Sequence, residues 1–145
     1  MSRLIRIAAA LIDDGNGSLF LVRKRGTTKF MQAGGKIERD EQPLETLARE
    51  LAEELAFTPP TDPWYLGLRT AEAANEPGRL VEAHLFHIRT LPLPFSLGAE
   101  LEEGVWVSLA GAPRLTLAPL TRLHVLPLAR GLCPSGQAPT WPKKG

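Results

Sequence analysis

Three glutamates crowd one short stretch of the chain. Glu50, Glu53 and Glu54 lie within "RELAEEL", directly after Arg49. At about 100° per residue, an α-helix places all three on one face, where like charges three and four residues apart repel one another. Arg49 can pair with Glu53 four residues later, and a divalent cation would neutralise the remaining charge. Carboxylate oxygens of high negative charge suit Mg²⁺ or Mn²⁺ rather than zinc.

The stretch taken alone is equally typical of a charged helix face exposed to water. The wider spacing favours a functional site instead, because the acids belong to a longer pattern. Its members are Gly35, Glu41, Arg49, Glu50, Leu51, Glu53, Glu54 and Phe57. This pattern resembles the Nudix box of the Nudix hydrolases at every position but one. Ala56 stands where the family has glycine, which predicts a helix that ends one residue later or a strained cap.

The resemblance implies a Nudix-type α/β/α sandwich with a central mixed β-sheet. It also implies a divalent-metal-dependent pyrophosphohydrolase that cleaves a nucleoside diphosphate linked to another moiety, with Mg²⁺ or Mn²⁺ as cofactor. Carried over by position, Glu50 and Glu54 resemble the inner metal ligands and Glu53 a further ligand or the general base. Gly34 resembles a backbone carbonyl ligand.

Other residues resemble supporting parts of such a site. Arg49 is expected to orient Glu53, and Glu41 resembles an acid close to the metal ligands. Glu100, six residues before Trp106, resembles an additional metal ligand or the general base, with Glu102 and Glu103 as competitors for that role.

Cations near the pattern are candidates for substrate binding. Strand alternation predicts Arg23 and Arg25 on one face and Lys24 on the other, so Arg23 or Arg25 is expected to contact phosphate. Lys36 follows the double glycine and is a third candidate. Surface charge exposed to water is the alternative for both arginines.

Aromatic and histidine side chains offer weaker signals. The rings that could stack on a base are those of Phe30, Trp64, Tyr65 and Phe86, although aromatic residues in strands more often belong to the core. His84 and His87 are three residues apart in an expected strand and face opposite ways, which argues against a joint metal site.

The elements that must position these residues can be read from apolar patterns. Residues 3–12 and 18–25 predict a β-hairpin around "DDGNG", and residues 29–35 have strand character. Leu44, Leu47, Leu51 and Leu55 form the apolar stripe of a helix that begins near Pro43. Further strands are expected at 64–70, 80–90 and 104–109, with loops at 71–78 and 91–103. A second helix is expected from Pro119 to residue 132, disturbed at Pro127.

The totals exclude several classes of protein. The chain has 145 residues and a formal net charge of +1, which predicts one domain (residues 1–132, with a tail at 133–145) and no bulk attraction to nucleic acid or membrane. Cys133 is the single cysteine, so no intrachain disulfide can form. No apolar run is long enough to cross a membrane. We therefore expect a cytoplasmic protein.

The expected substrate is a small-molecule nucleotide. Hydrolysis of nucleoside triphosphates or their modified forms to a monophosphate and pyrophosphate is the leading hypothesis. Cleavage of a nucleotide sugar or dinucleotide is a second, and nucleotide binding by a non-catalytic regulator with the same fold is a third. The presence of Glu50, Glu53 and Glu54 together argues against the regulator, because a protein that only binds nucleotide does not need all three acids. A homodimer is possible, but no segment indicates an interface.

Overall fold

A computed structural model describes residues 3–132, so the expected tail and Cys133 lie outside the described residues. The strands are β1 (Leu4–Asp13), β2 (Ser18–Lys24), β3 (Phe30–Met31), β4 (Ala33–Lys36), β5 (Trp64–Glu72), β6 (Leu80–Arg89) and β7 (Leu101–Ser108). The helical segments are α1 (Pro43–Leu55), η1 (Ala112–Arg114), η2 (Thr121–Val125) and α2 (Leu126–Leu132). Within residues 3–132, no helix has the length and apolar character needed to span a membrane.

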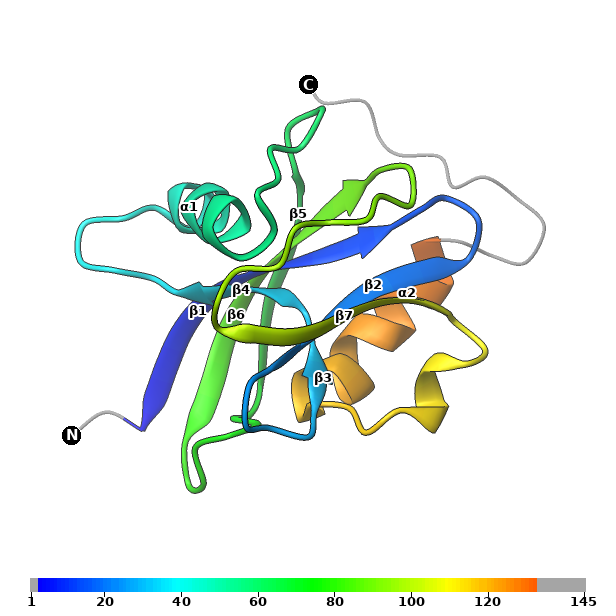
Figure 1. Ribbon diagram of the computed structural model, residues 1–145. Coiled ribbons are helices and arrows are strands. Elements are labelled where there is room, and N and C mark those ends of the chain that lie inside the picture. Colours follow the sequence, from blue (N-terminus) through cyan, green and yellow to red (C-terminus); the bar gives the residue numbers. More distant parts are fainter. Residues whose placement is uncertain (1–2, 133–145) are drawn as a thin grey trace.

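The long strand β1 lies at the centre of one mixed sheet (Figure 1). It pairs in parallel with β6 along its whole length, and β5 follows antiparallel at that edge. On its other side, β1 pairs antiparallel with β4 and then, at Ile12 and Asp13 only, with β2. The predicted hairpin is therefore confirmed, but its strands separate quickly because β4 takes the place beside β1. The turn contains two glycines at positive φ, Gly15 and Gly17, as the sequence predicts.

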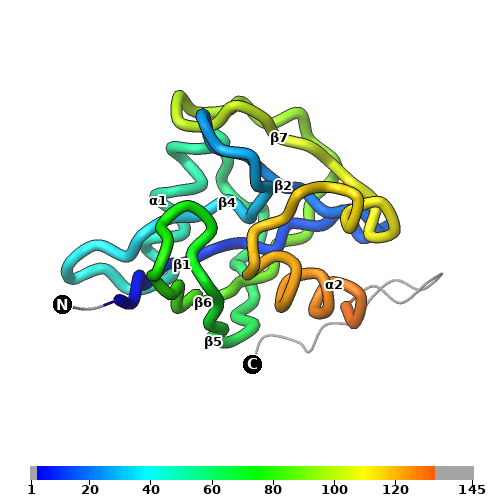
Figure 2. The backbone as a smooth tube through the Cα atoms, turned by 90° about the horizontal axis from the view of Figure 1, so that it is seen from below, coloured from blue at the N-terminus to red at the C-terminus, as the bar shows by residue number. Residues whose placement is uncertain are grey.

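Both faces of β1 are covered, because its side chains alternate between two cores. Ala8, Ala10 and Ile12 pack with α1, whereas Ala9 and Leu11 pack with α2. Figure 2 shows α1 and α2 on opposite sides of the strands. The predicted α/β/α sandwich with a central mixed sheet is confirmed.

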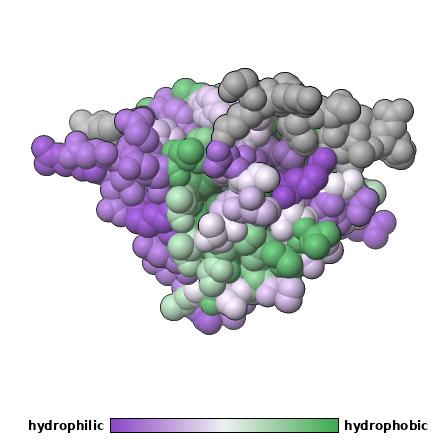
Figure 3. Space-filling model, turned by 90° about the horizontal axis from the view of Figure 1, so that it is seen from above, coloured by the Kyte–Doolittle hydropathy of each residue, from purple (hydrophilic) through white to green (hydrophobic). Residues whose placement is uncertain are grey.

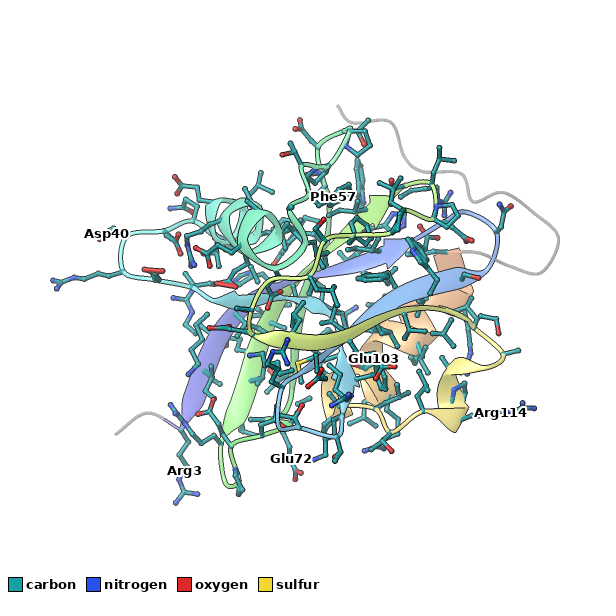
Figure 4. The ribbon with its side chains drawn as sticks, in the orientation of Figure 1. Arg3, Asp40, Phe57, Glu72, Glu103 and Arg114 are labelled. Atoms are coloured by element: carbon teal, nitrogen blue, oxygen red, sulfur yellow. The ribbon has the colours of Figure 1, made fainter. Side chains whose placement is uncertain are left out.

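Helix α1 binds the sheet through fewer leucines than the sequence suggests. Leu47, Leu51 and Leu55 are buried, but Leu44 is 44% exposed, so its assignment to the apolar stripe was wrong. Leu44 lies in the first turn, next to the exposed loop that leads into the helix. Hydrophilic residues gather on the surface at the end of the molecule where this loop and α1 lie (Figure 3), and Asp40 lies at the tip of the loop (Figure 4).

Ala56 forms the C-cap of α1 in the left-handed conformation, with φ 50° and ψ 42°. Its backbone N–H donates to the Ala52 carbonyl at 3.1 Å, and that of Phe57 donates to Leu51 at 3.2 Å. The helix therefore does not continue past Leu55. Of the two outcomes that the sequence left open, the strained cap is the one observed, because a β-carbon makes this conformation unfavourable.

Ala56→Gly is therefore expected to stabilise the protein, by about 1 kcal/mol, since glycine adopts the left-handed conformation without that cost. Urea unfolding measures the change. Ala52→Gly is a matched control, because Ala52 is exposed in the helix interior. It should lower the unfolding free energy by about 1 kcal/mol. A loss of stability in Ala56→Gly would contradict the assigned cap.

The C-terminal helical segment begins at Pro119 as predicted. Thr121–Val125 adopts π-helical geometry before α2 continues through Pro127. Proline lacks an N–H and its ring crowds the carbonyl four residues earlier, which accounts for the wider turn at this position. Two predicted loop boundaries were wrong, because β5 extends to Glu72 and β7 starts at Leu101.

Candidate active site

The double glycine of β4 meets the acidic face of α1. The backbone N–H of Gly34 donates to Glu54 Oε1 at 2.9 Å. The Glu50 carboxylate packs on Gly35, where a β-carbon would lie 2.5 Å from Oε2 and 2.7 Å from Oε1. Glycine is therefore required at position 35 for this close approach. The two predicted inner ligands and Gly34 are brought together here.

The three glutamates of α1 differ in burial. Glu54 is 5% exposed and the Glu50 side chain 15%, whereas the Glu53 side chain is 62% exposed. The helical wheel explains this order, because Glu54 lies about 60° from the centre of the leucine stripe and Glu53 about 160°. Glu50 and Glu54 therefore face the interior of the site and Glu53 lies at its edge.

Burial perturbs both inner carboxyl groups. It raises the pKa of Glu54 to about 7; Glu50 and Glu100 add to this effect, and the hydrogen bond from Gly34 opposes it. Burial also raises the pKa of Glu50, against the hydrogen bond from Arg49. Carboxylates held this close need a compensating positive charge to ionise together.

Arg49 forms hydrogen bonds with two of the acids around the site. Its Nε and Nη2 donate to the two oxygens of Glu41 at 2.8 and 2.9 Å, and its Nη1 donates to Glu50 at 2.8 Å. Its contact with Glu53 is longer, at 3.8 Å. The predicted pairing with Glu53 is thus present as the longer contact, because Arg49 forms its short hydrogen bonds with Glu41 and Glu50. That Arg49 orients Glu53 stays a prediction. The hydrogen bond from Arg49 holds the pKa of Glu41 at about 2.

Glu100 is brought to the acids by the loop before β7. The backbone N–H of Gly98 donates to the Glu54 carbonyl at 2.7 Å, and the N–H of Arg25 donates to the Glu100 carbonyl at 3.0 Å. Its competitors point elsewhere: Glu102 pairs with Arg25 and Glu103 with Arg23, each at 3.2 Å. The structure thus places Glu100, not its neighbours, beside the α1 acids, while its catalytic role stays a prediction.

A cavity of about 580 Å³ opens beside the double glycine. Its wall includes Glu100 and the cations Lys24, Arg25 and Lys36. The other wall residues are mostly apolar, from β1, β6 and the segment before η2: Ile5, Ile7, Ala9, Val81, Ala118 and Leu120. Glu72 also lines the cavity and lies at the end of β5 (Figure 4). The cavity wall therefore combines charged and apolar residues.

The predicted phosphate contacts are divided between the cavity and the surface. Arg25 and Lys36 line the cavity, and Lys36 pairs with Glu76 at 3.4 Å. Arg23 does not line it, since its guanidinium binds Glu103 and the Thr27 carbonyl. Lys24, which alternation places on the opposite face from Arg23, does line the cavity, and its charge opposes the rise in the pKa of Glu54. Arg25 follows the end of β2, so strand alternation does not constrain it.

The aromatic candidates for base stacking lie outside the cavity wall. Phe30 and Phe86 belong to the core, and the Tyr65 hydroxyl forms a hydrogen bond with His84 Nδ1 at 2.9 Å. His87 Nε2 contacts the buried carboxylate of Asp13 at 2.7 Å. The two histidines therefore have separate partners on opposite faces, as predicted.

The residues present fit a divalent cation. Glu50 and Glu54 supply carboxylate oxygens whose pKa values are raised mainly by burial and further by the neighbouring glutamates, and oxygen donors of this kind suit hard cations. Within residues 3–132, however, no three Asp, Glu, His or Cys side chains form a ready-made metal cluster. Arg49 and Gly34 instead hold the two carboxylates as separate hydrogen-bond acceptors.

Comparison with known proteins agrees with this geometry. The NUDIX domain family model matches residues 3–128. A MutT protein from Methanosarcina mazei Go1 superposes with a TM-score of 0.72 at 25% identity, covering 90% of this chain and 95% of that one. The Escherichia coli ORF135 protein superposes with a TM-score of 0.66 at 25% identity, covering 94% of this chain and 96% of that one. The NUDIX domain of Shewanella oneidensis NrtR, solved with ADP ribose, superposes with a TM-score of 0.71 at 20% identity. The match covers 88% of this chain and 87% of that one.

No curated protein matches the chain. The family match covers most of the sequence, and the sheet, the α1 acids and the double glycine form one site in the structure. Nudix hydrolases generally use divalent metal ions. The chain belongs to the Nudix hydrolase family.

Proposed function

We propose that the protein hydrolyses nucleoside triphosphates, or modified forms of them, to a monophosphate and pyrophosphate with Mg²⁺ as cofactor. The observation that supports this most is the cavity beside the double glycine, whose wall combines Glu100 and the cations Lys24, Arg25 and Lys36 with apolar residues. Phosphates would lie against the charged residues of this wall and the nucleoside against the apolar ones.

Glu50 and Glu54 would hold the metal, assisted by the Gly34 carbonyl, with Glu53 as an outer ligand. When bound, a divalent cation neutralises the pyrophosphate charge and lowers the pKa of an attacking water. Lys24 and Arg25 bind outer phosphate oxygens, and Lys36 does so at the cavity rim. Arg49 orients Glu50 through the hydrogen bond described above.

The proton of the attacking water passes to a carboxylate oxygen of Glu100. Glu100 lines the cavity, whereas Glu53 is mostly exposed, which favours Glu100 as general base. Water attack at phosphorus forms one P–O bond and breaks the bond to the leaving phosphate oxygen. The nucleotide leaves as a monophosphate, and pyrophosphate carries away the remaining two phosphoryl groups.

A second candidate is hydrolysis of a nucleoside diphosphate joined to a sugar. The cavity wall that would hold a second sugar contains polar groups, among them Glu72, Asn75 and Glu76. The related NrtR domain was solved with ADP ribose, which fits the same class of ligand.

A substrate panel distinguishes these functions. The purified chain is incubated with Mg²⁺ and, separately, with natural and oxidised nucleoside triphosphates, ADP-ribose, nucleotide sugars and dinucleoside polyphosphates. We expect at least one triphosphate to give the monophosphate by chromatography. Inorganic phosphate should appear only when pyrophosphatase is added, because pyrophosphate is the second product. Chelation with EDTA should stop the reaction.

Other outcomes are equally decisive. Turnover of sugar-linked nucleotides alone would favour the second candidate. Tight nucleotide binding without turnover, in either Mg²⁺ or Mn²⁺, would indicate a regulator and contradict the enzymatic proposal.

A further inference from the structure

Gln32 is a buried amide in the cavity wall, between β3 and β4. The residue is 7% exposed, and its Oε1 accepts a hydrogen bond from the Thr121 hydroxyl at 3.1 Å. Its Nε2 is buried and has no hydrogen-bond partner among residues 3–132. Buried amide nitrogens nearly always have a partner, so an orphaned one calls for a ligand group that completes it.

The backbone around Gln32 is fixed on both sides. Before it, the Phe30 N–H donates to the Thr116 carbonyl at 2.8 Å, and the Ala118 N–H donates to the Phe30 carbonyl at 2.9 Å. After it, Ala33 pairs with Ala10 of β1. Thr121 is itself fully buried at the start of η2. The amide is thus held in one orientation before any ligand arrives, which lowers the cost of binding.

The neighbours of Gln32 in the cavity identify the part of the ligand that reaches it. Met31, Ala118 and Leu120 line the same cavity and are apolar. The same cavity carries Lys24, Arg25 and Lys36, which would hold the phosphates of the ligand. A flat, mostly apolar group that carries a hydrogen-bond acceptor fits this compartment, and a nucleobase is such a group.

We propose that Gln32 is a specificity-determining residue that donates from Nε2 to a carbonyl oxygen of the nucleobase; this inference rests on the proposed function. The hydrogen bond from Thr121 to Oε1 fixes the orientation of the amide, and Nε2, which lacks a partner among residues 3–132, is the donor left for the ligand. An oxo group completes the hydrogen bond, whereas an amino group at the same position places two donors against each other. The site therefore favours oxo-bearing bases over their amino counterparts.

Two pairs of nucleotides test the inference directly. Inosine and adenosine triphosphate differ at position 6 of the purine, and uridine and cytidine triphosphate differ at position 4 of the pyrimidine. We expect the wild type to prefer the oxo member of at least one pair by about tenfold in kcat/KM, as one buried hydrogen bond allows. The preference should lie mainly in KM, because the base is remote from the reacting phosphorus.

Gln32→Met keeps the volume of the side chain and removes the donors. The ratio of kcat/KM for the oxo member to kcat/KM for the amino member should therefore fall to within about twofold of unity. Thr121→Val should lower the ratio less, because the amide remains but loses its anchor. Thr70→Val is the matched control, since Thr70 is exposed and outside the cavity wall, and it should leave the ratio unchanged. Thermal unfolding of each variant checks that it is folded.

Failure of this inference can be told apart from failure of the proposed function. A wild type that hydrolyses nucleotides without preferring either oxo member, or a Gln32→Met variant with the wild-type ratio, overturns the role of Gln32. If no nucleotide is hydrolysed, equilibrium dialysis with the same two pairs measures the ratio of dissociation constants instead. An unchanged binding ratio in Gln32→Met and Thr121→Val then overturns the inference as well.

Discussion

Glu54→Gln is expected to lower kcat by on the order of a thousandfold or more, while making the metal-free protein more stable at alkaline pH. The loss follows because a metal ligand contributes several kcal/mol to the transition state, and about 1.4 kcal/mol corresponds to a factor of ten. Glutamine keeps the shape of the side chain and an oxygen to accept the Gly34 N–H. The variant therefore removes the charge with little change in packing.

The gain in stability follows from the raised pKa of Glu54. Its value of about 7 in the folded protein exceeds the ordinary 4.5, so the folded state binds the proton more tightly than the unfolded state. This favourable contribution is fully present below about pH 4.5 and is lost as the pH rises through 7. At pH 8 the buried charge is a cost of at most roughly 3 kcal/mol, which glutamine removes.

Urea unfolding in EDTA at pH 5 and pH 8 measures this difference. The free energy of unfolding of Glu54→Gln should exceed that of the wild type at pH 8, and the difference should be much smaller at pH 5. Added Mg²⁺ should stabilise the wild type and not the variant, because only the wild type binds it tightly. Glu82→Gln is the control, since Glu82 pairs with Arg6 and lies outside the cavity wall. Full activity in Glu54→Gln would exclude it as a metal ligand.

The local parts of this site could be predicted from the sequence because helix geometry is local. The spacing of Glu50, Glu53 and Glu54 predicted that they share one face of the helix, and the position of the leucine stripe accounts for the order of burial that the structure shows. The partner of Arg49 could not be predicted in this way. Glu41 lies eight residues away, in the loop before α1, and only the folded loop brings it to the guanidinium.

The non-local parts of the fold were harder to predict. The parallel pairing of β1 with β6 and the place of β4 beside β1 join segments far apart in the sequence. Alternation correctly separated Arg23 from Lys24, but it could not tell which face of β2 borders a cavity. Gln32 carried no local signal either, since one polar residue in an apolar strand is ordinary. Its role depends on Thr121, 89 residues later.

Alanine substitutions in the double glycine are expected to have the second large effect. Gly35→Ala should impair catalysis, whereas Gly34→Ala should impair stability. Gly35→Ala should lower kcat/KM by about a hundredfold or more, since displacement of a catalytic group by 1 Å has effects of that size. The added β-carbon would lie 2.5 Å from Glu50 Oε2. The carboxylate is the far end of a flexible side chain, so it can move away and the fold should survive.

Gly34→Ala should instead destabilise the protein by at least about 3 kcal/mol, because backbone strain and overpacking add together. Its φ of +149° is unfavourable for alanine, and a β-carbon would overlap the Ala8 carbonyl oxygen and lie 2.7 Å from Ala9 Cα. Both atoms belong to the backbone of the central strand β1, which cannot shift without disturbing its pairing with β6.

Gly17→Ala separates the two causes. Gly17 has a φ of +90° but no atom within 4 Å of an added β-carbon, so this variant reports the backbone strain alone, about 1–2 kcal/mol. Urea unfolding and kcat/KM are measured on all three variants. The expected order of stability loss is Gly34→Ala, then Gly17→Ala, then Gly35→Ala, with catalysis lost in a folded protein only for Gly35→Ala.

If Gly35→Ala retained full activity, the Glu50 carboxylate would not need its observed position for catalysis, and the metal site would have to be built without it. If Gly35→Ala unfolded as readily as Gly34→Ala, the contact between β4 and α1 would be part of the core rather than the site. The two glycines share one sequence motif, but Gly34 meets the backbone of β1 and Gly35 meets the end of a side chain. Stability should therefore depend on the first and chemistry on the second.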